Sequence, residues 1–319
     1  MQNILLGVDI GGTTIKMGIT NVDGQMIDKW EIPTQINDKA DQIPNDIWNS
    51  IKEKLSVHQI TEDQLIGIGA GAPGFVIADT GVIAEAVNLG WKNFPLGERL
   101  NQLSGLPVYV ENDANIAALG ENWLGAGDLS DDLIMITLGT GVGGGIITNG
   151  KIISGTNGTA GEIGHMTMVH DGHLCNCGRT GCLETIASAT GISRLAEEKV
   201  NRYQDSSLYS TYQKKNKLSA KDVFKAYEKN DPCAKEVVSY VLDVLGLAIS
   251  NMTTVLNPEK ILIGGGVSKA GDVLLKPLKA SYQKYALPRI HQGSTIEIAR
   301  LGNDAGIIGG AYLVKQHSL

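Results

Sequence analysis

This chain contains the same pattern twice. A run of β-branched residues ends in a glycine-rich turn and begins a meander of strands. Residues 4–10 and 14–20 predict two strands joined by a Gly-Gly turn, and the Asp-Gly pair at 23–24 leads into a third strand. Residues 133–138, the glycine turn 139–145 and a hairpin with an Asn-Gly signal at 149–150 repeat this order. The second meander therefore echoes the first.

Helical and strand patterns alternate between and after these meanders. Apolar residues at fourfold spacing predict a helix between residues 43 and 55, and residues 65–70 predict a strand. Short strands are also expected at 107–110, which leads to the sequence Glu-Asn-Asp, and at 260–264. The order favours a mixed α/β fold. A chain of 319 residues exceeds the usual size of one core, so we expect two domains and a cleft between them.

Two further helices have start and stop signals. Ser219 and Asp222 resemble a capping box, and the sequence from Asp231-Pro232 is amphipathic until Asn257-Pro258. Residues 201–218 are polar and lack periodicity, and we expect a surface connection there.

Glycine makes up 40 of the 319 residues, about one in eight, compared with an average of about 7%. The glycines cluster at strand ends, where their backbone amides can approach a phosphate or a ribose. A simple turn is the alternative at each position. The chain lacks the Walker spacing, which disfavours a P-loop. It also lacks a Gly-x-Gly-x-x-Gly motif at the start of a helix in a βαβ unit, which disfavours a dinucleotide site.

A histidine and three cysteines at close spacing predict a zinc site. His165, Cys175, Cys177 and Cys182 follow the pattern His-x9-Cys-x-Cys-x4-Cys, and imidazole with thiolates forms a common closed tetrahedral shell. A disulfide or reduced core cysteines are the alternative. No signal peptide precedes the first predicted strand, so we expect a reducing compartment and no disulfide. Cys233 lies in a helical pattern and is interpreted as a small packing residue.

Composition limits the partners. The formal charge is −7, and no basic arm is present to neutralise phosphates, which argues against nucleic acid as a partner. The apolar fraction is 42%, and we find no run near the roughly 20 residues that span a bilayer. We therefore expect a cytoplasmic protein that does not associate with membranes.

Several motifs, taken in order, resemble the ROK sugar kinases of the actin-like ATPase superfamily, and are most like the bacterial glucokinases of that group. Residues 9–16 are similar to the first phosphate motif of the family, residues 138–165 to its signature, and residues 175–184 to its zinc motif. The resemblance covers nearly the whole chain. It implies two actin-like (ribonuclease H-like) α/β domains, at 1–117 and 118–303, with a helix from about residue 304 to 319 returning to the first domain.

The resemblance also implies a reaction, the transfer of the γ-phosphoryl group of ATP to the 6-hydroxyl of a hexose, for which we favour glucose. N-acetylmannosamine, fructose and mannose are the alternative hexoses. A sugar-responsive ROK regulator is disfavoured because the phosphate motif begins by residue 9 and leaves no room for a DNA-binding domain. A non-catalytic sugar-binding protein is disfavoured because Asp9 and Asp113 are both present.

The resemblance assigns residues to each part of that reaction. Asp113 is expected to be the general base, and Asp9 to hold Mg²⁺, through water. ATP is expected to contact Asp9, Gly11, Gly12, Thr13, Thr14, Lys16, Thr140, Gly141, Gly265 and Gly266. The sugar is expected to contact Gly71, Asn88, Asn112, Asp113, Glu162, His165 and Glu184. The family's Zn²⁺ ligands correspond to the four residues named above, and the active form is expected to be a homodimer.

Overall fold

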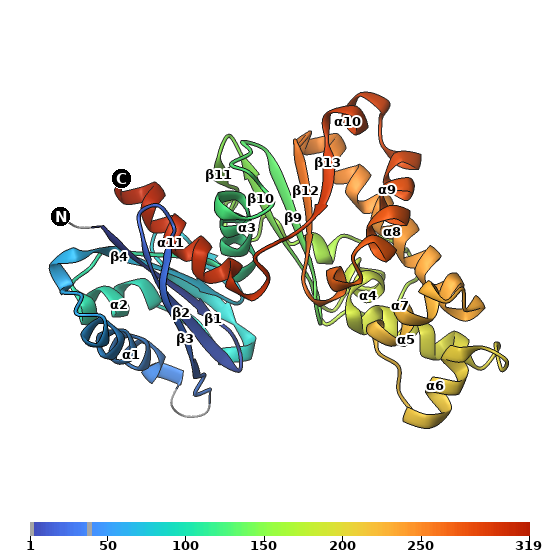
Figure 1. Ribbon diagram of the computed structural model, residues 1–319, viewed down its shortest axis with the longest axis horizontal. Helices are drawn as coiled ribbons and strands as arrows, with labels where there is room; N and C mark the ends of the chain where they lie inside the picture. The colour runs from blue at the N-terminus through green and yellow to red at the C-terminus, as the bar shows by residue number, and fades with distance from the viewer. Residues whose placement is uncertain (1–2, 37–39) are drawn as a thin grey trace. The chain divides into compact units, whose positions relative to one another are not determined.

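The computed structural model describes residues 3–36 and 40–319 (Figure 1). The chain divides into two units, Met1–Leu129 with Gly145–Gly161 and Leu301–Leu319, and Ser130–Gly144 with Glu162–Arg300. The predicted α/β architecture is confirmed. We had expected the first domain to end at residue 117, which lies within helix α3 (Asp113–Leu124).

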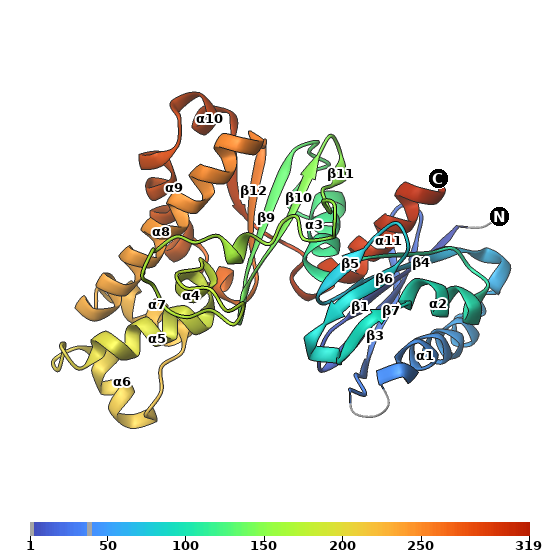
Figure 2. The same ribbon diagram turned by 180° about the vertical axis from the view of Figure 1, so that it is seen from behind.

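The first unit contains a five-stranded sheet in the order β3-β2-β1-β4-β8. Its strands are β1 (Ile4–Ile10), β2 (Thr14–Asn21), β3 (Met26–Pro33), β4 (Leu65–Ala72) and β8 (Val108–Asn112). The three N-terminal strands form the predicted antiparallel meander, whereas β4 and β8 extend the sheet in parallel. The connection between β4 and β8 contains a small antiparallel sheet of β5 (Phe75–Ile77), β6 (Val82–Ala86) and β7 (Trp91–Phe94) (Figure 2).

Helices cover both faces of this sheet because its strands are apolar on both sides. Leu6 and Val8 of β1 share a core with α1 (Ile43–Val57) and α2 (Leu96–Ser104). The neighbouring Leu5, whose side chain points to the opposite face, packs with residues of α3 and α11 (Ala305–Ser318). The helix predicted between residues 43 and 55 is confirmed.

The second unit contains most of a sheet with the order β11-β10-β9-β12-β13. Its strands are β9 (Leu133–Leu138), β10 (Val142–Thr148), β11 (Lys151–Ile152), β12 (Lys260–Gly264) and β13 (Thr295–Ile298). In both sheets a meander precedes two strands that are added in parallel after long crossovers. The second sheet therefore repeats the strand order of the first.

The crossovers of the second unit are mainly helical. They contain α4 (Glu184–Ala187), α5 (Ala189–Val200), α6 (Ser207–Lys215), α7 (Ala220–Glu228), α8 (Pro232–Leu256), α9 (Asp272–Tyr285) and α10 (Pro288–Gly293). Short 3₁₀ helices span Ala40–Gln42, Glu62–Gln64, Val87–Leu89, Ile163–His165, Gly266–Ala270 and Gly302–Asp304.

The polar segment 201–218, for which the sequence predicts a surface connection, contains the helix α6. Ser206 caps this helix by accepting the backbone N–H of Tyr209, and Leu208 is its one buried residue. One buried apolar residue gives no periodicity in the sequence, and the start of this helix is determined by its local cap. The capping box at Ser219 and the helix that follows Asp231 are confirmed.

In the part of the chain that the structure describes, one helix, α8, is long and apolar enough to cross a membrane. This helix contradicts the expectation that no apolar run approaches the length that spans a bilayer. Of the apolar window of α8, 67% is buried inside the protein, and Cys233 at its start is fully buried. Such burial is typical of a central core helix.

Helices α3 and α11 approach each other more closely than side chains would allow. A Cβ atom on Gly309 would lie 1.6 Å from the carbonyl oxygen of Ile116, and one on Gly120 would lie 2.1 Å from that of Ala305. Glycine is therefore required where the two helix backbones touch.

We predict that Gly309→Ala destabilises the protein by about 3 kcal/mol, because the two helices must move apart to make room for the methyl group. Urea unfolding followed by circular dichroism measures this change. Gly293→Ala is the matched control, since a Cβ atom there meets nothing within 4 Å. Equal stability of the two variants would contradict the close helix contact.

Candidate active site

Three parallel strands of the first unit bring several predicted site residues to one sheet edge. Asp9 of β1 lies opposite Gly71 of β4, and Ala72 of β4 lies opposite Asn112 of β8. Asp113 follows directly as the first residue of α3. The carboxyl ends of parallel strands are where open α/β sheets bind ligands, so this edge is a candidate ligand site.

Asp9 is a largely buried carboxylate beside one cation. Lys16 Nζ lies 3.8 Å from Asp9 Oδ2. Burial raises the pKa of the Asp9 carboxyl, and the lysine opposes that rise. A Cβ atom on Gly306, at the start of α11, would lie 2.7 Å from Asp9 Cγ. Gly306 could not be predicted from the sequence, because its contact joins it to Asp9, which lies far away in the chain.

The turn between β1 and β2 exposes its central residues. The Gly11 N–H donates to the Thr14 carbonyl at 3.0 Å, and Thr34 holds the turn from outside by donating to the carbonyls of Gly11 and Thr13. Gly12 and Thr13 are exposed. A Cβ atom on Gly12 would lie 3.8 Å from Asn88 Cβ, so the exposed Asn88 lies beside this turn.

The β8–α3 turn presents Asp113 and fixes Asn112. The Asn112 side chain caps α3 by accepting the Ala114 N–H at 2.8 Å, and its Nδ2 donates to the Gly74 carbonyl at 3.0 Å. Asp113 is exposed, and its Oδ1 also accepts the Ala114 N–H. Glu111, which sequence reasoning missed, is buried below the turn and accepts the N–H of Asn112. The turn is therefore rigid where Asp113 projects.

The second unit has an equivalent edge at the ends of β9 and β12, which pair in parallel with Thr137 opposite Gly264. Thr140 and Gly141 follow β9, and Gly265 and Gly266 follow β12. Gly265 has φ +81°, and a Cβ atom there would lie 2.5 Å from the Leu138 carbonyl oxygen. Only glycine fits this position.

A cavity of about 750 Å³ lies beside Gly266 in the second unit. Ala220 and Phe224 of α7 and Val267 and Val273 after β12 supply an apolar lining, with Lys221, Lys225 and Glu228 also along the wall. A mostly apolar pocket with a few charged groups suits a flat heterocyclic ligand. This cavity could not be predicted from the sequence, because α7 and the turn after β12 are far apart in the chain.

Glu162, His165 and Glu184 form one cluster in the second unit. Glu162 Oε2 lies 3.8 Å from His165 Nε2, and Glu184 Oε2 accepts the Val142 N–H at 3.0 Å. Burial raises the pKa of Glu162, and the Glu184 carboxylate adds to the rise while His165 opposes it. A Cβ atom on Gly141 would lie 2.3 Å from Glu184 Oε2, so this cluster touches the glycine turn after β9.

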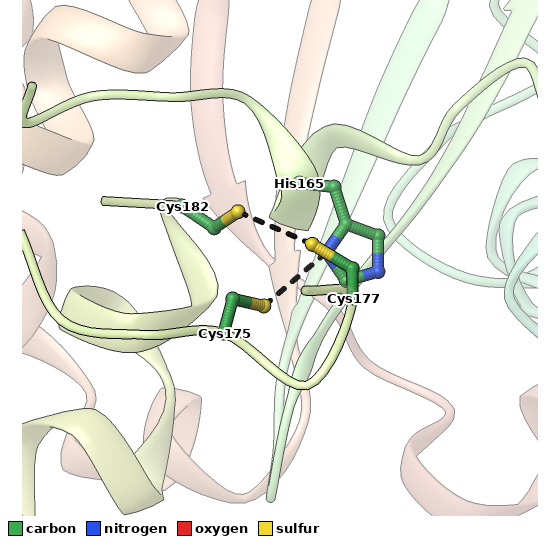
Figure 3. Close-up of side chains that lie close together, drawn as sticks. All are labelled: His165, Cys175, Cys177 and Cys182. Carbon is green, nitrogen blue, oxygen red and sulfur yellow. Dashed lines mark hydrogen bonds between the residues drawn. The ribbon is translucent and has the colours of Figure 1, made fainter. Parts of the chain in front are cut away.

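His165, Cys175, Cys177 and Cys182 converge as predicted, and their ligand atoms lie within 4.8 Å of one another (Figure 3). Cys175 Sγ is 3.6 Å from His165 Nδ1, and Cys177 Sγ is 3.6 Å from Cys182 Sγ. Ligands 2.3 Å from a tetrahedral zinc are separated by about 3.8 Å, whereas sulfurs in a disulfide are about 2.05 Å apart. All four cysteines of the chain are free thiols. The donor set therefore fits zinc.

The thiols of this cluster differ strongly in acidity. The backbone N–H of Arg179 lowers the pKa of Cys177 to about 6, whereas burial raises that of Cys182 to about 12. A buried thiol needs a metal cation to become a thiolate. His165 Nδ1 faces the sulfurs while Nε2 faces Glu162, so metal binding would fix the imidazole tautomer.

The model of the ROK family matches residues 5–317. The chain belongs to the ROK family. A glucokinase of Halalkalibacterium halodurans is 55% identical over 312 residues, which cover 98% of this chain and 94% of that protein.

Two solved structures of the ROK family are also similar. A glucokinase from Streptomyces griseus, in complex with glucose and AMPPNP, has a TM-score of 0.75 and 32% identity, with 98% of this chain and 99% of that one covered. A ROK family transcriptional regulator, a homologue of the E. coli MLC protein, has a TM-score of 0.87 and 28% identity, with 99% of this chain but 78% of that one covered. Kinases and regulators thus share this ROK fold.

The predicted site residues of this ROK chain fall into two sets. Asp9, the 11–16 turn, Gly71, Asn88, Asn112 and Asp113 belong to the first unit. Thr140, Gly141, Glu162, His165, Glu184, Gly265 and Gly266 belong to the second. Each set is assembled within its own unit, which is what a two-domain enzyme requires of its halves.

We predict that the purified protein contains one zinc ion per chain and that Cys177→Ala removes it, because three ligands hold a structural zinc poorly. Elemental analysis after dialysis measures the metal. Cys233→Ala is the matched control, since Cys233 is buried in α8 away from the cluster. Equal zinc in both variants would rule out this site.

Proposed function

We propose that this ROK family protein is a glucokinase, which transfers the γ-phosphoryl group of ATP to the 6-hydroxyl of glucose. The observation that supports the proposal most is the 55% identity to a glucokinase over 98% of the chain. The carboxylates that the chemistry needs are also present. Asp9 lies near the carboxyl end of β1 and Asp113 directly follows β8, with the parallel strand β4 between the two strands.

We assign the general-base role to Asp113. A sugar hydroxyl is a weak nucleophile at neutral pH, so a carboxylate must accept its proton as the bond to phosphorus forms. Asp113 is exposed at the start of α3, and Asn112 and Glu111 hold the turn below it. An exposed carboxylate on a rigid turn suits proton transfer, since its position is fixed before substrate binds.

We assign the nucleotide to residues of both units. When bound, Mg²⁺ would neutralise charge on the phosphates. Asp9 suits such an ion because it is a largely buried carboxylate, and Lys16 adds a positive charge beside it. The turns at 11–14 and 140–141 offer backbone amides for phosphates. The cavity beside Gly266 suits the adenine ring.

We assign the sugar to Glu162, His165 and Glu184, with Gly71, Asn88 and Asn112 on the first unit. Two carboxylates and an imidazole can each bond a hydroxyl at a fixed angle, which favours one hexose over analogues that lack it. Zinc would act structurally by holding the loop that carries His165 and Glu184. In keeping with the family resemblance, we propose a cytoplasmic homodimer.

A regulator function is less well supported. The similar ROK regulator has the same fold, so the fold does not discriminate the two classes. The nearness of Asp9 to Lys16 and the exposure of Asp113 favour the kinase, because a sensor that only binds sugar needs neither group.

We predict that Asp113→Asn lowers kcat roughly 100- to 10,000-fold while glucose still binds, because the amide keeps the shape but cannot accept the proton. A coupled kinase assay and isothermal calorimetry measure the two effects. Asp63→Asn, an exposed aspartate of a 3₁₀ turn, is the control. A kcat near that of the unchanged protein would reject the base assignment.

The kinase function itself is tested with a panel of sugars. We expect kcat/KM for glucose to exceed that for mannose, fructose and N-acetylmannosamine by at least about tenfold, the discrimination that one well-placed contact provides. Faster phosphorylation of N-acetylmannosamine would reject glucose as the substrate. Absence of phosphorylation of every sugar would reject the kinase function.

A further inference from the structure

Glu121 of α3 is a fully buried carboxylate that none of the assigned sites uses. Its Oε1 accepts the backbone N–H of Leu301 at 2.6 Å, and its Oε2 accepts that of Ala126 at 3.1 Å. The two partners are 175 residues apart in sequence, so a single side chain joins distant segments. Both oxygens act as acceptors, which suits an ionised carboxylate.

Both partners lie where the chain passes between the two units. The first unit also contains Gly145–Gly161, so the chain passes between the units four times; the first passage follows Leu129, three residues after Ala126, and the last ends at Leu301 itself. Glu121 therefore accepts hydrogen bonds from the backbone just before the first of these passages and just after the last. Positions of this kind absorb the backbone rotation when a domain closes on its ligand.

The outgoing segment wraps tightly around Glu121. The Glu121 carbonyl accepts the N–H groups of Gly125 and Gly127, and a Cβ atom on Gly125 would lie 2.0 Å from Glu121 Oε2. Asp128 and Leu129 follow with φ of +52° and +56°, a region that non-glycine residues rarely occupy. The segment is therefore held in one unusual conformation up to the unit boundary.

We propose that Glu121 is a positioning residue that couples the outgoing and returning segments, so that the second unit moves as one body when substrates bind. The inference rests on the proposed kinase function, because the assigned groups are divided between the units. Asp113 belongs to the first, whereas Glu162 and Glu184 belong to the second. Phosphoryl transfer from ATP to the sugar requires these groups in one defined arrangement, and Glu121 joins two of the four segments that connect the units.

Glu121→Gln tests the proposal. The amide keeps one acceptor oxygen but places an NH₂ group against a second N–H donor, so one segment is released. We expect the KM for glucose to rise and kcat to fall, each about tenfold, because the closed form is less populated. Small-angle X-ray scattering should show a smaller decrease in the radius of gyration on adding glucose than for the unchanged protein.

Asp231→Asn is the matched control. Asp231 is also a buried carboxylate that accepts backbone N–H groups, those of Leu208 and Ala234, but it lies within the second unit at the start of α8. Loss of its charge should lower the melting temperature and leave KM, kcat per folded molecule and the scattering change unaltered. A purely structural role for Glu121 would give the same result as this control and would overturn the proposal.

Leu301→Pro provides a second test if Glu121→Gln does not fold. Proline removes the N–H that Glu121 accepts, and the φ of −78° at Leu301 is compatible with the proline ring. The same rise in KM and loss of closure support the proposal, and normal values overturn it. If the unchanged protein phosphorylates no sugar, the kinase function fails. If the unchanged protein phosphorylates glucose and closes, and both variants do the same, only the inference about Glu121 fails.

Discussion

The contact between α3 and α11 positions most of the first unit's chemistry. The two helices touch through Gly120 and Gly309, with no room for a side chain between the backbones. This contact brings the C-terminal helix against the sheet, where Gly306 packs on Asp9. It also fixes α3, which begins at Asp113 and presents Glu121 to Leu301. One packing constraint thus supports the assigned base, the assigned metal ligand and the proposed coupling residue.

The repeated sheet explains why the assigned groups form two sets. Each sheet delivers the carboxyl ends of parallel strands to one edge, β1 with β4 and β8 in one case and β9 with β12 in the other. In the first sheet these ends carry carboxylates. In the second they carry glycine turns beside the cavity at Gly266. The same backbone arrangement therefore presents carboxylates in one unit and glycine turns beside a cavity in the other, which are the groups to which we assign the base and the adenine ring.

Local patterns made much of this fold predictable, and long-range contacts account for what was missed. The meander strands, α1 and the ends of α8 were evident because periodicity, Asp-Pro and Asn-Pro signals act within a few residues. The short strands β5–β7 depend on packing against distant segments, and α6, with a local cap and one buried residue, has no apolar periodicity. The four zinc ligands could be predicted because they lie within 18 residues of sequence. Gly306, Glu111 and Glu121 could not, since each matters through a partner that only the fold brings near.

Glu184 of α4 joins the candidate zinc cluster to the turn that follows β9. One of its oxygens lies 3.8 Å from Cys175 Sγ, and the other accepts the N–H of Val142 directly after the Thr140-Gly141 turn. The absence of a Cβ atom on Gly141 allows this approach. A shift of the cysteine loop would therefore move Glu184 and loosen the turn that holds Val142. Under the proposed assignment, the cysteine cluster, the carboxylate assigned to the sugar and the turn assigned to the phosphates are coupled through this one side chain.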